Sequence, residues 1–367
     1  MGVMNRRTFL KWLGLGSIAS IVGGGAWAKV TSSMNPYYKG PVARNFDGSI
    51  FFNPNGVPPG DFRGLLKWQL FEPKAKWPEQ YLSPFANAKP VPTVADDVSA
   101  TMIGHATFLI QTAGLNFLTD PVFSQRASPF QFAGPKRKQP PGVSIDDLPS
   151  IDVILLSHNH YDHFDMGSLK QLVDRDNPLI VTPLGNDAII LKAIKNARTK
   201  TGNWDDIVSV GNNVDVHFEP MHHWSARAAT DRRMALWAAF VIDSPVGKTY
   251  IIGDTGFHDG INYRAAAEKH GRFKLAIIPV GAYNPRWFME HMHQNPEEAV
   301  QGHILCNAET SIAHHWGTFQ LTNEPIEEPI ERLAQARIDQ GLAEEDFVVL
   351  LPGQERRSSA GAQKVAG

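Results

Sequence analysis

The 367-residue chain is 43% hydrophobic and 20% charged, which provides enough apolar sequence for the large core of a soluble globular protein. Its formal net charge is −2, and removing the first 28 residues with Arg6, Arg7 and Lys11 leaves −5. Nucleic-acid-binding proteins are usually strongly basic, so this class is disfavoured and no nucleic acid is expected as a partner. Cys306 is the only cysteine, which excludes a disulfide bond within the chain.

The first 28 residues are typical of a twin-arginine export signal. Arg6 and Arg7 precede a weakly apolar, glycine-rich stretch without charges, which closes on Ala26-Trp27-Ala28. We predict cleavage after Ala28 and a periplasmic location for the exported protein. The stretch is too short and too rich in glycine to be a good membrane span, but an uncleaved membrane anchor is the alternative.

Residues 29–95 are predicted to form an irregular N-terminal arm, because ten prolines from Pro36 to Pro92 leave few runs long enough for regular structure. The arm should pack on the main domain through its aromatic side chains, which are Trp68, Phe71, Trp77, Tyr81 and Phe85. The main domain is expected to span residues 96–355, and residues 356–367 are expected to form a flexible tail.

Short β-type runs open the main domain, and strands alternate with helices further along the chain. Strands are expected at Val98–Ile103, Thr107–Thr112, Leu115–Thr119, Ile151–Leu156, Leu179–Thr182, Val214–Phe218, Ala238–Ile242, Thr249–Ile252, Leu275–Pro279 and Phe347–Leu351. Helices are expected at Gly167–Asp174, Asp187–Lys195 and Pro329–Gln340. A further helix begins after the cap Asn295, with Pro296 at its first position and Glu298 three residues after the cap. This order predicts two sheets with helices outside them.

A cluster of histidines follows one of the predicted strands. The segment His158-Asn159-His160-Tyr161-Asp162-His163 places three imidazoles and a carboxylate within six residues, directly after the apolar run Ile151–Leu156. Imidazole nitrogens and carboxylate oxygens are the ligands that borderline divalent ions such as zinc accept. These side chains cannot all reach one tetrahedral ion comfortably, so the spacing favours two adjacent ions. A histidine-rich surface loop is the simpler alternative, but the buried-type strand before the cluster argues against it.

Three further strand ends carry metal-ligating residues. They are Pro220-Met221-His222-His223-Trp224, Gly253-Asp254-Thr255-Gly256 and Ile312-Ala313-His314-His315-Trp316-Gly317. Adjacent residues of an extended segment point to opposite sides, so only one histidine of each pair should face the ions. Asp254 is well placed to bridge both ions through its two oxygens, and an ordinary turn aspartate before glycine is the alternative.

The ordered motifs His-x-His-x-Asp-His, a later His, Gly-Asp-Thr-Gly and a final His resemble those of the metallo-β-lactamase superfamily. Local sequence is closer still to the family of N-acylphosphatidylethanolamine-hydrolysing phospholipases D. The segments that carry this second resemblance are Gly104–Thr107, Leu118–Pro121, Arg126–Pro129, Gly134–Arg137, Pro279–Tyr283, Pro285–Met289, Pro296–Val300 and His315–Phe319. The resemblance runs from about Asn45 to about Gly353. It implies an α/β fold, the four-layer αββα metallo-β-lactamase-type sandwich of two mixed sheets flanked by helices, with residues 96–355 as the catalytic domain.

The resemblance also implies a set of seven ligands for two zinc ions. One ion is expected on His158, His160 and His223, and the other on Asp162, His163 and His315, with Asp254 bridging them. His223 and His315 are preferred over their histidine neighbours because the family's ligand stands beside the tryptophan, here Trp224 and Trp316. Iron and manganese stay open as alternatives to zinc.

Three more residues are assigned to the site. Asp120 matches a family aspartate that is important for activity, and it is expected to orient a ligand histidine through the free ring N–H. His293 and His303 match family histidines near the reacting phosphate, where they could stabilise phosphoryl oxygens or assist the leaving group. Surface or helix-packing histidines are the alternative for both. The triplet Lys136-Arg137-Lys138 is considered for contact with anionic head groups, and a solvated turn is the alternative.

The implied reaction is hydrolysis of a phosphodiester. Two zinc ions ~3.5–4 Å apart can hold a bridging water and lower its pKa from ~15.7 towards ~7, which gives a hydroxide nucleophile at neutral pH. The expected substrate is N-acylphosphatidylethanolamine or a related glycerophospholipid, cleaved as by a phospholipase D into phosphatidic acid and an N-acylethanolamine. Contact with a membrane surface and homodimer formation are left open.

Two other functions are kept as alternatives. One is a zinc lactonase or another phosphodiesterase of the same fold. A classical zinc β-lactamase is disfavoured because it places a cysteine at the second ion, whereas Cys306 lies in the helix before the last ligand. The other is a non-catalytic exported metal-binding envelope protein, which would be expected to have lost at least one ligand.

Overall fold

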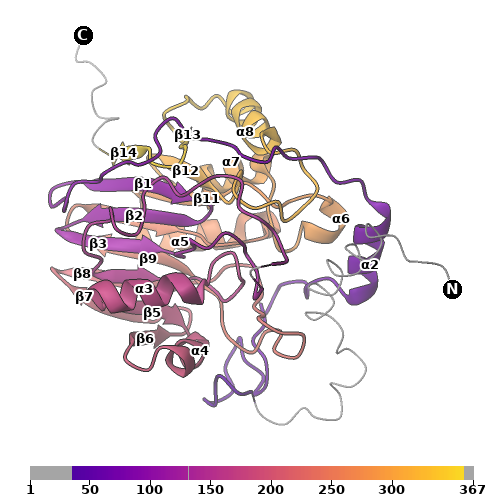
Figure 1. The fold of residues 1–367 in the computed structure, drawn as a ribbon, viewed down its shortest axis with the longest axis horizontal. Coiled ribbons are helices and arrows are strands. Elements are labelled where there is room, and N and C mark those ends of the chain that lie inside the picture. The colour runs from indigo at the N-terminus through magenta and orange to yellow at the C-terminus, as the bar shows by residue number, and fades with distance from the viewer. Residues whose placement is uncertain (1–34, 131, 359–367) are drawn as a thin grey trace.

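Two seven-stranded mixed sheets pack face to face in the computed structural model, which describes residues 35–130 and 132–358 (Figure 1). Helices cover the outer faces of both sheets, so the predicted four-layer αββα sandwich is confirmed. The predicted export signal lies outside the described residues.

The first sheet has the strand order β14-β1-β2-β3-β4-β5-β6. Its strands are β1 (Val98–Gly104), β2 (Thr107–Thr112), β3 (Leu115–Thr119), β4 (Val153–Leu155), β5 (Leu179–Pro183), β6 (Arg198–Gly202) and β14 (Glu355–Arg357). Strands β3 to β6 run parallel to one another, whereas β14, β1, β2 and β3 pair antiparallel. Strand β14 crosses the boundary that the sequence predicts between the main domain and the tail, after residue 355. Its residues Glu355–Arg357 pair with Ser99–Thr101 of β1.

The second sheet has the strand order β13-β12-β11-β10-β9-β8-β7. Its strands are β7 (Ile207–Gly211), β8 (Val214–Glu219), β9 (Ala239–Ser244), β10 (Gly247–Ile251), β11 (Leu275–Pro279), β12 (Ser311–His314) and β13 (Phe347–Val349). Here β10 to β13 are parallel and β7 to β10 are antiparallel.

The helices pack on the sheets through apolar side chains. They are α2 (Phe62–Phe71), α3 (Met166–Asp176), α4 (Asn186–Ala193), α5 (Ile261–His270), α6 (Arg286–Met289), α7 (Pro296–Leu305) and α8 (Glu328–Asp339), with a short 3₁₀ turn at His258–Gly260. Leu169 and Leu172 of α3 join Ile154 of β4 in one apolar cluster on the outer face of the first sheet. On the other side of β4, Val153 and Leu155 belong to the large core between the sheets. This alternation along one strand is what a sheet buried on both faces requires.

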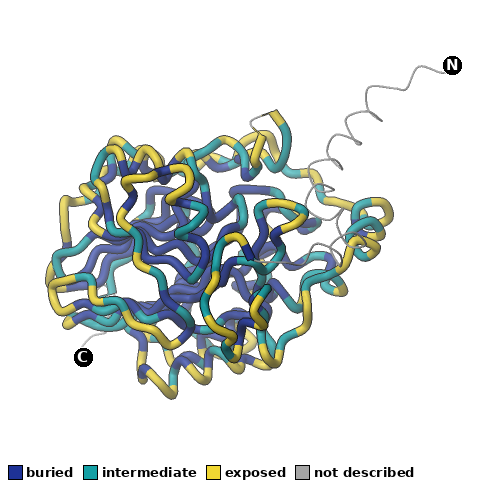
Figure 2. Tube along the Cα trace, turned by 90° about the horizontal axis from the view of Figure 1, so that it is seen from below, coloured by how far each residue is buried: buried dark blue, intermediate teal, exposed yellow. Residues whose placement is uncertain are grey.

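Burial is concentrated along the centre of the sandwich, and exposed residues form the outer helices and loops (Figure 2). The strands β1, β2 and β11 are buried at every residue. Close packing holds such strands rigidly, so the loops that follow them start from fixed positions. None of the helices among the described residues is long and apolar enough to cross a membrane.

The N-terminal arm differs in two ways from the irregular segment expected from its sequence. It contains the ten-residue helix α2, whose cap Asp61 accepts a hydrogen bond from Gly64 N. Its strongest anchors are Phe46 and Phe51, which are fully buried in the main core, whereas Phe71 and Phe85 are exposed. Trp68 is buried as expected. The prolines therefore interrupt the arm without preventing it from contributing to the core.

Candidate metal centre

The loops that follow the strands β3, β4, β8, β10 and β12 bring eight polar side chains to one edge of the sandwich. The β4 loop supplies His158, His160, Asp162 and His163, and the other loops supply Asp120, His223, Asp254 and His315. All these residues except His160 are buried. Parallel strands end at the same edge of a sheet, which explains how residues far apart in the sequence meet there.

The first group consists of His158, His160 and His223. The distance from His158 Nε2 to His160 Nδ1 is 2.9 Å, and that from His223 Nε2 to His160 Nδ1 is 3.1 Å. Asp254 Oδ2 lies 3.8 Å from His158 Nε2 and 3.6 Å from His223 Nε2. Four ligand atoms thus face one point.

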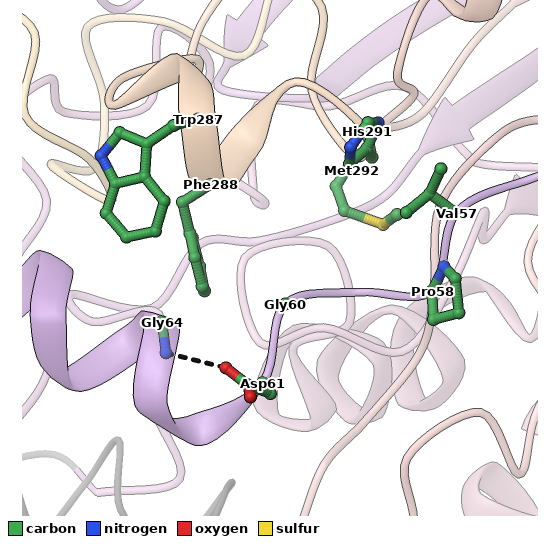
Figure 3. Close-up of a pocket in the computed structure, with 9 residues that line it drawn as sticks. All are labelled: Val57, Pro58, Gly60, Asp61, Gly64, Trp287, Phe288, His291 and Met292. Atoms are coloured by element: carbon green, nitrogen blue, oxygen red, sulfur yellow. Dashed lines mark hydrogen bonds between the residues drawn. The ribbon is translucent and has the colours of Figure 1, made fainter.

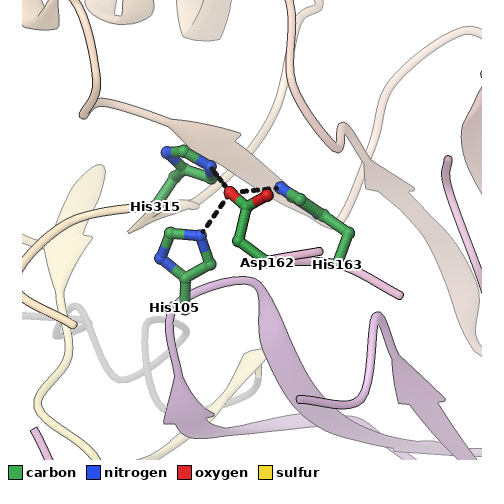
Figure 4. Close-up of side chains that lie close together, drawn as sticks. All are labelled: His105, Asp162, His163 and His315. Atoms are coloured by element: carbon green, nitrogen blue, oxygen red, sulfur yellow. Dashed lines mark hydrogen bonds and ion pairs between the residues drawn. The ribbon is translucent and has the colours of Figure 1, made fainter. Parts of the chain in front are cut away.

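The second group is built around Asp162 (Figure 4). Asp162 Oδ2 lies 3.1 Å from His105 Nε2, 3.5 Å from His163 Nε2 and 3.2 Å from His315 Nε2. The rings of His105 and His315 pack with centroids 4.1 Å apart, and the rings of His163 and His315 are stacked at 5.2 Å. His105 comes from the turn between β1 and β2, which lies at the same edge of the first sheet as the end of β3, since Thr107 Oγ1 donates to the carbonyl oxygen of Asp120 at 2.7 Å.

Asp254 lies between the two groups. Its Oδ2 is 3.2 Å from His163 Nε2, and its Oδ1 is 3.1 Å from His315 Nε2, while Oδ2 also faces the first group. The two groups are therefore adjacent, and one carboxylate touches both. This is the position that the sequence predicts for a bridging aspartate.

Asp120 binds the loop that carries the histidines. Its Oδ1 accepts a hydrogen bond from Ser157 N at 2.7 Å, and its Oδ2 accepts from Ser157 Oγ at 2.6 Å and from His163 Nδ1 at 2.7 Å. The hydrogen bond to His163 places the proton of that ring on Nδ1. Nε2 of His163 is consequently the ring nitrogen that points into the centre.

The same tautomer follows for two histidines of the first group. Ser157 Oγ uses its proton on Asp120, so His158 Nδ1 must donate to Ser157 Oγ at 2.9 Å. His223 Nδ1 donates to the carbonyl oxygen of Met292 at 3.1 Å. In both rings Nε2 is left as a lone pair facing His160.

Three residues of the centre have a left-handed backbone although none is glycine. The φ angles are 59° at His105, 34° at Asp120 and 66° at His315. Such conformations cost about 1–3 kcal/mol each and concentrate where a functional arrangement requires them. The sharp turns allow the side chains to point back into the edge of the sandwich.

The histidines of the cluster fall into two classes according to whether their pKa is lowered or raised. Burial lowers the pKa of His160 and His293 to about 4 each, and it holds the pKa of His158 and His223 well below the usual range. For His315, burial acts downwards, but Asp254 and Asp162 outweigh it and raise the pKa to about 9. Burial also opposes charge on His163, whose pKa is nevertheless raised by Asp254, Asp162 and Asp120.

These observations fit a pair of divalent cations. Ligand atoms on a tetrahedral zinc ion with bonds of ~2.0–2.1 Å stand roughly 3.3 Å apart, close to the observed 2.9–3.8 Å. His163 Nε2 and Asp254 Oδ1, which face the centre, are buried without a hydrogen-bond partner among the described residues. The neutral imidazoles of the first group offer inward lone pairs, and His163 and His315 would release a proton when the ions bind. Together with the carboxylates they form the donor set that such ions require.

The second histidine of each pair points away from the centre. His222 Nδ1 contacts Asn262 Nδ2 at 2.9 Å, and its ring stacks on His258 with centroids 3.8 Å apart. His314 Nε2 donates to the carbonyl oxygen of Ile252 at 2.7 Å. The structure thus places His223 and His315, rather than their neighbours, at the centre.

His293 and His303 occupy different environments. His293 Nε2 lies 4.0 Å from Asp254 Oδ2, and its Nδ1 is buried without a partner among the described residues, so this ring lines the centre. His303 instead faces the start of β12, where its Nδ1 contacts Ser311 Oγ at 2.8 Å and its ring packs on Phe347. The expectation that His303 stands near the reacting group is corrected, because α7 directs this side chain toward the strand rather than the centre.

Two further sequence expectations change with the structure. His105 belongs to the second group, although the sequence pointed only to its motif Gly104–Thr107 and not to a role in the centre. The triplet Lys136-Arg137-Lys138 is not one exposed patch. Arg137 is buried and donates to the carbonyl oxygens of Val122 and Gln139, and Lys138 pairs with Glu79.

A groove of about 240 Å³ opens beside the centre, between the arm and the segment around α6 (Figure 3). Its walls are largely apolar, and they are formed by Val57, Pro58, Gly60, Gly64, Trp287, Phe288 and Met292, with Asp61 and His291 at its rim. The carbonyl of Met292 holds His223, so the groove and the centre share a wall. A side chain at Gly60 would clash with the ring of Phe288, which explains the glycine at this position.

Comparison with known proteins places the chain in a class. A model of the beta-lactamase superfamily domain matches residues 115–316, more than half of the chain, and the chain therefore belongs to this superfamily. A metallo hydrolase from Ignicoccus hospitalis shares the fold with a TM-score of 0.53 and 19% identity over 71% of this chain and 97% of that structure. The fold, the family and the two groups of ligands define a metal-dependent hydrolase.

Two curated sequences are more similar. The N-acyl-phosphatidylethanolamine-hydrolyzing phospholipase D 1 of Caenorhabditis elegans is 40% identical over 250 residues, which cover 64% of this chain and 68% of that protein. An uncharacterized protein of Mycobacterium tuberculosis is 32% identical over 346 residues, covering 92% of this chain and 89% of that protein. The resemblance stated from the motifs is confirmed.

Proposed function

We propose that this protein hydrolyses a phosphodiester at a dinuclear zinc centre, with N-acylphosphatidylethanolamine or a related glycerophospholipid as substrate. The observation that carries the proposal is the pair of adjacent ligand groups joined by Asp254. The similarity of the chain to the phospholipase D of Caenorhabditis elegans supports the choice of substrate.

Seven side chains would hold the ions. His158, His160 and His223 form one set, Asp162, His163 and His315 form the other, and Asp254 touches both. When bound, two such cations supply a hydroxide nucleophile at neutral pH and neutralise the charge that grows on phosphoryl oxygens.

The protein's own residues orient this chemistry. Asp120 fixes the ring of His163, and Ser157 and Met292 fix those of His158 and His223. His293 stands at the edge of the centre with a free Nδ1, where it can donate a hydrogen bond to a phosphoryl oxygen or transfer a proton to the leaving alkoxide. Burial lowers the pKa of His293 to about 4, so the ring is neutral at pH 7 and suited to hydrogen-bond donation. To protonate the alkoxide, it would first have to take up the proton that the attacking water releases.

The groove beside the centre supports a lipid substrate. Phe288, Met292 and Val57 offer apolar surface next to the histidines, as an acyl chain attached to the scissile group requires. Arg232 lies next to the groove, since its guanidinium donates to the carbonyl oxygen of Gly60 at 3.2 Å. Its guanidinium is also 4.6 Å from the ring centroid of Trp224, which in turn packs on His160. A cation at this position would attract an anionic head group.

The proposal is tested by turnover of three substrates side by side. Purified protein should convert N-acylphosphatidylethanolamine to phosphatidic acid and an N-acylethanolamine, identified by mass spectrometry, and chelator should abolish the reaction. The D254N variant should lose activity and metal together. Turnover of a lactone in preference to a water-soluble phosphodiester and the lipid would instead support a zinc lactonase, and no hydrolysis of any of them would support a non-catalytic metal-binding protein.

We also propose that the protein is exported to the periplasm by the twin-arginine route. The support is the sequence Arg6-Arg7 before a glycine-rich apolar stretch that ends at Ala28. Cell fractionation should find the mature protein in the periplasm with a new N-terminus at Lys29. An R6K/R7K variant should stay in the cytoplasm, and export of that variant at the normal rate would reject this route.

A further inference from the structure

A second set of metal-ligating side chains lies on the outer face of the second sheet, apart from the centre described above. His217 and Glu219 alternate with the core residues Val216 and Phe218 along β8, so both point outward toward α5. His270, the last residue of α5, meets them there. Each of the three offers one ligand atom, and these atoms lie within 4.8 Å of one another.

The three side chains are largely removed from solvent. The exposed fractions of the side chains are 13% for His217, 5% for Glu219 and 3% for His270. Glu219 Oε1 accepts hydrogen bonds from His270 Nε2 at 2.8 Å and from Lys269 Nζ at 2.7 Å. The network is therefore organised around one carboxylate oxygen.

His217 is the member of this set that the network leaves without a partner. Its Nδ1 is buried and has no hydrogen-bond partner among the described residues, and its Nε2 is 4.0 Å from Asp243 Oδ2, beyond hydrogen-bond distance. The ring meets that of His270 edge-on, with centroids 4.8 Å apart. A buried imidazole nitrogen without a partner is costly for a purely structural network, and it is the feature that a bound cation would satisfy.

We propose that His217, Glu219 and His270 form a separate binding site for a borderline divalent cation such as Zn²⁺. Two imidazoles and a carboxylate are a frequent donor set for this ion, and water would complete the coordination from the partly exposed side of His217. The ion would replace the hydrogen bond between Glu219 and His270. Lys269 is more than one-third exposed and also pairs with Asp205, so its ammonium group can leave Glu219 when the ion enters.

The location gives the ion a structural role. It would join the end of α5 to the end of β8, and Glu219 stands four residues before His223 of the catalytic centre. None of the three residues contacts that centre, because they lie on the opposite face of the strand from the core. Activity is therefore expected to survive loss of this ion.

Metal counting tests the proposal. After dialysis against buffered Zn²⁺, the native protein should hold one zinc ion more per chain than H217N or H270N. The zinc content is measured by elemental mass spectrometry. The D215N variant is the matched control, because Asp215 lies on the same face of β8 two residues before His217, and it should hold the same amount as the native protein. The D254N variant, which disrupts the catalytic centre, should still hold this ion.

Equal zinc content in the native protein and H217N would overturn the proposal and leave the set as an ion-pair network. Should H217N fail to fold, anomalous diffraction from zinc-soaked crystals of the native protein provides the second measurement. A peak between His217 and His270 is expected, and its absence would reject the site. The K269M variant should bind the ion more tightly, whereas weaker binding would show that Glu219 is not a ligand.

Discussion

Asp120 and Asp254 each follow a buried strand, yet their carboxylates have different partners. Asp254 faces histidines of both groups, whereas Asp120 receives three hydrogen bonds from the loop that carries them. Asp254 could be found in the sequence as an aspartate after a buried-type strand, whereas Asp120 was assigned from the family resemblance. Their different roles depend on the left-handed backbone at Asp120, which turns its side chain toward the β4 loop.

Replacing Asp120 with Asn should loosen the centre without removing a ligand. An amide at this position can still accept one hydrogen bond, but it no longer attracts the proton of His163 to Nδ1 with a full negative charge. Loss of such an orienting carboxylate typically costs 10–100-fold in metal affinity or activity. We expect a decrease of about this size in zinc affinity and in turnover for D120N.

The control for D120N is D165N. Asp165 lies two residues after His163 and also accepts several hydrogen bonds, from Gly167 N, Ser124 N and Ser168 Oγ. None of these donors is a ligand histidine. The D165N variant should unfold more easily and bind zinc normally. Normal zinc affinity in D120N would contradict the role assigned to Asp120.

Cys306 is expected to be unreactive in the folded protein. Its side chain is fully buried at the end of α7, and burial raises the pKa of the thiol to about 12. The reactive thiolate is therefore nearly absent at pH 8. Ellman's reagent should label the native protein slowly and the protein in guanidinium chloride fully. Rapid labelling of the native protein would contradict this expectation and show that this part of the core opens.

Site residues could be predicted from the sequence where several ligands share one short motif. They could not be predicted where the direction of a side chain depends on tertiary packing. The four ligands of the β4 loop share one short motif, and the structure brings them together. His105 was missed because a single histidine between two strands gives no sign that it meets Asp162. His303 was misassigned because its spacing on α7 does not show that its ring is directed to Ser311 and Phe347.

At the level of elements, strands with continuous apolar runs were predicted almost residue for residue. The strands β2, β3 and β11 have the bounds expected from the sequence. The edge strands β6 and β7 were missed because their residues alternate between exposed and half-buried positions, and Arg198–Gly202 contains no apolar residue. At β12 the sequence predicts only a strand end with metal ligands, at Ile312–Gly317, and not the bounds of the strand. Its pairing with β11 and β13 shows it as a short buried strand, a tertiary feature that its four residues cannot reveal.

The groove between the arm and α6 should determine chain-length preference. Phe288 packs on Trp68 of α2 with ring centroids 5.3 Å apart and lines the groove, so F288A removes apolar surface where an acyl chain would lie. Burial of each methylene is worth about 0.8 kcal/mol, so several lost contacts amount to a tenfold or larger effect. We expect KM for long-chain lipid to increase at least tenfold, with little change for a short water-soluble diester.

The matched control is F71A, because Phe71 ends the same helix α2 but is 77% exposed and does not line the groove. This variant should behave like the native protein with both substrates. An equal loss of activity toward lipid and short diester in F288A would indicate damage to the centre and would argue against an acyl site.

The cap of α7 should make a measurable contribution to stability. Asn295 Oδ1 accepts a hydrogen bond from Glu298 N, and Glu298 Oε2 accepts one from Asn295 N, while Glu298 also pairs with Arg286. Removing such a cap costs about 1 kcal/mol. Urea denaturation should show this loss for N295A and a much smaller one for N295D, which keeps an acceptor. An unchanged unfolding midpoint for N295A would show that the helix does not depend on its cap.

At the level of the whole molecule, the centre joins the two sheets. His158, His160, Asp162 and His163 follow β4 of the first sheet, whereas His223, Asp254 and His315 follow β8, β10 and β12 of the second. The ligands thus come from loops whose relative position depends on the core between the sheets. Phe46 and Phe51 of the arm are part of that core, so the arm also packs into the structure that positions the site.

Removing the metal should therefore destabilise the entire fold rather than one loop. A ligand present at 1,000 times its Kd stabilises the native state by about 4 kcal/mol, and without cations the buried carboxylates of Asp162 and Asp254 depend on protonated His163 and His315 for compensation. Calorimetry should show a clear decrease in Tm when the native protein is stripped with EDTA, and added Zn²⁺ should restore it. The D254N variant, lacking the carboxylate between the two groups, should respond far less to EDTA. If metal analysis confirms removal while the native Tm stays constant, the ions do not hold the two sheets together.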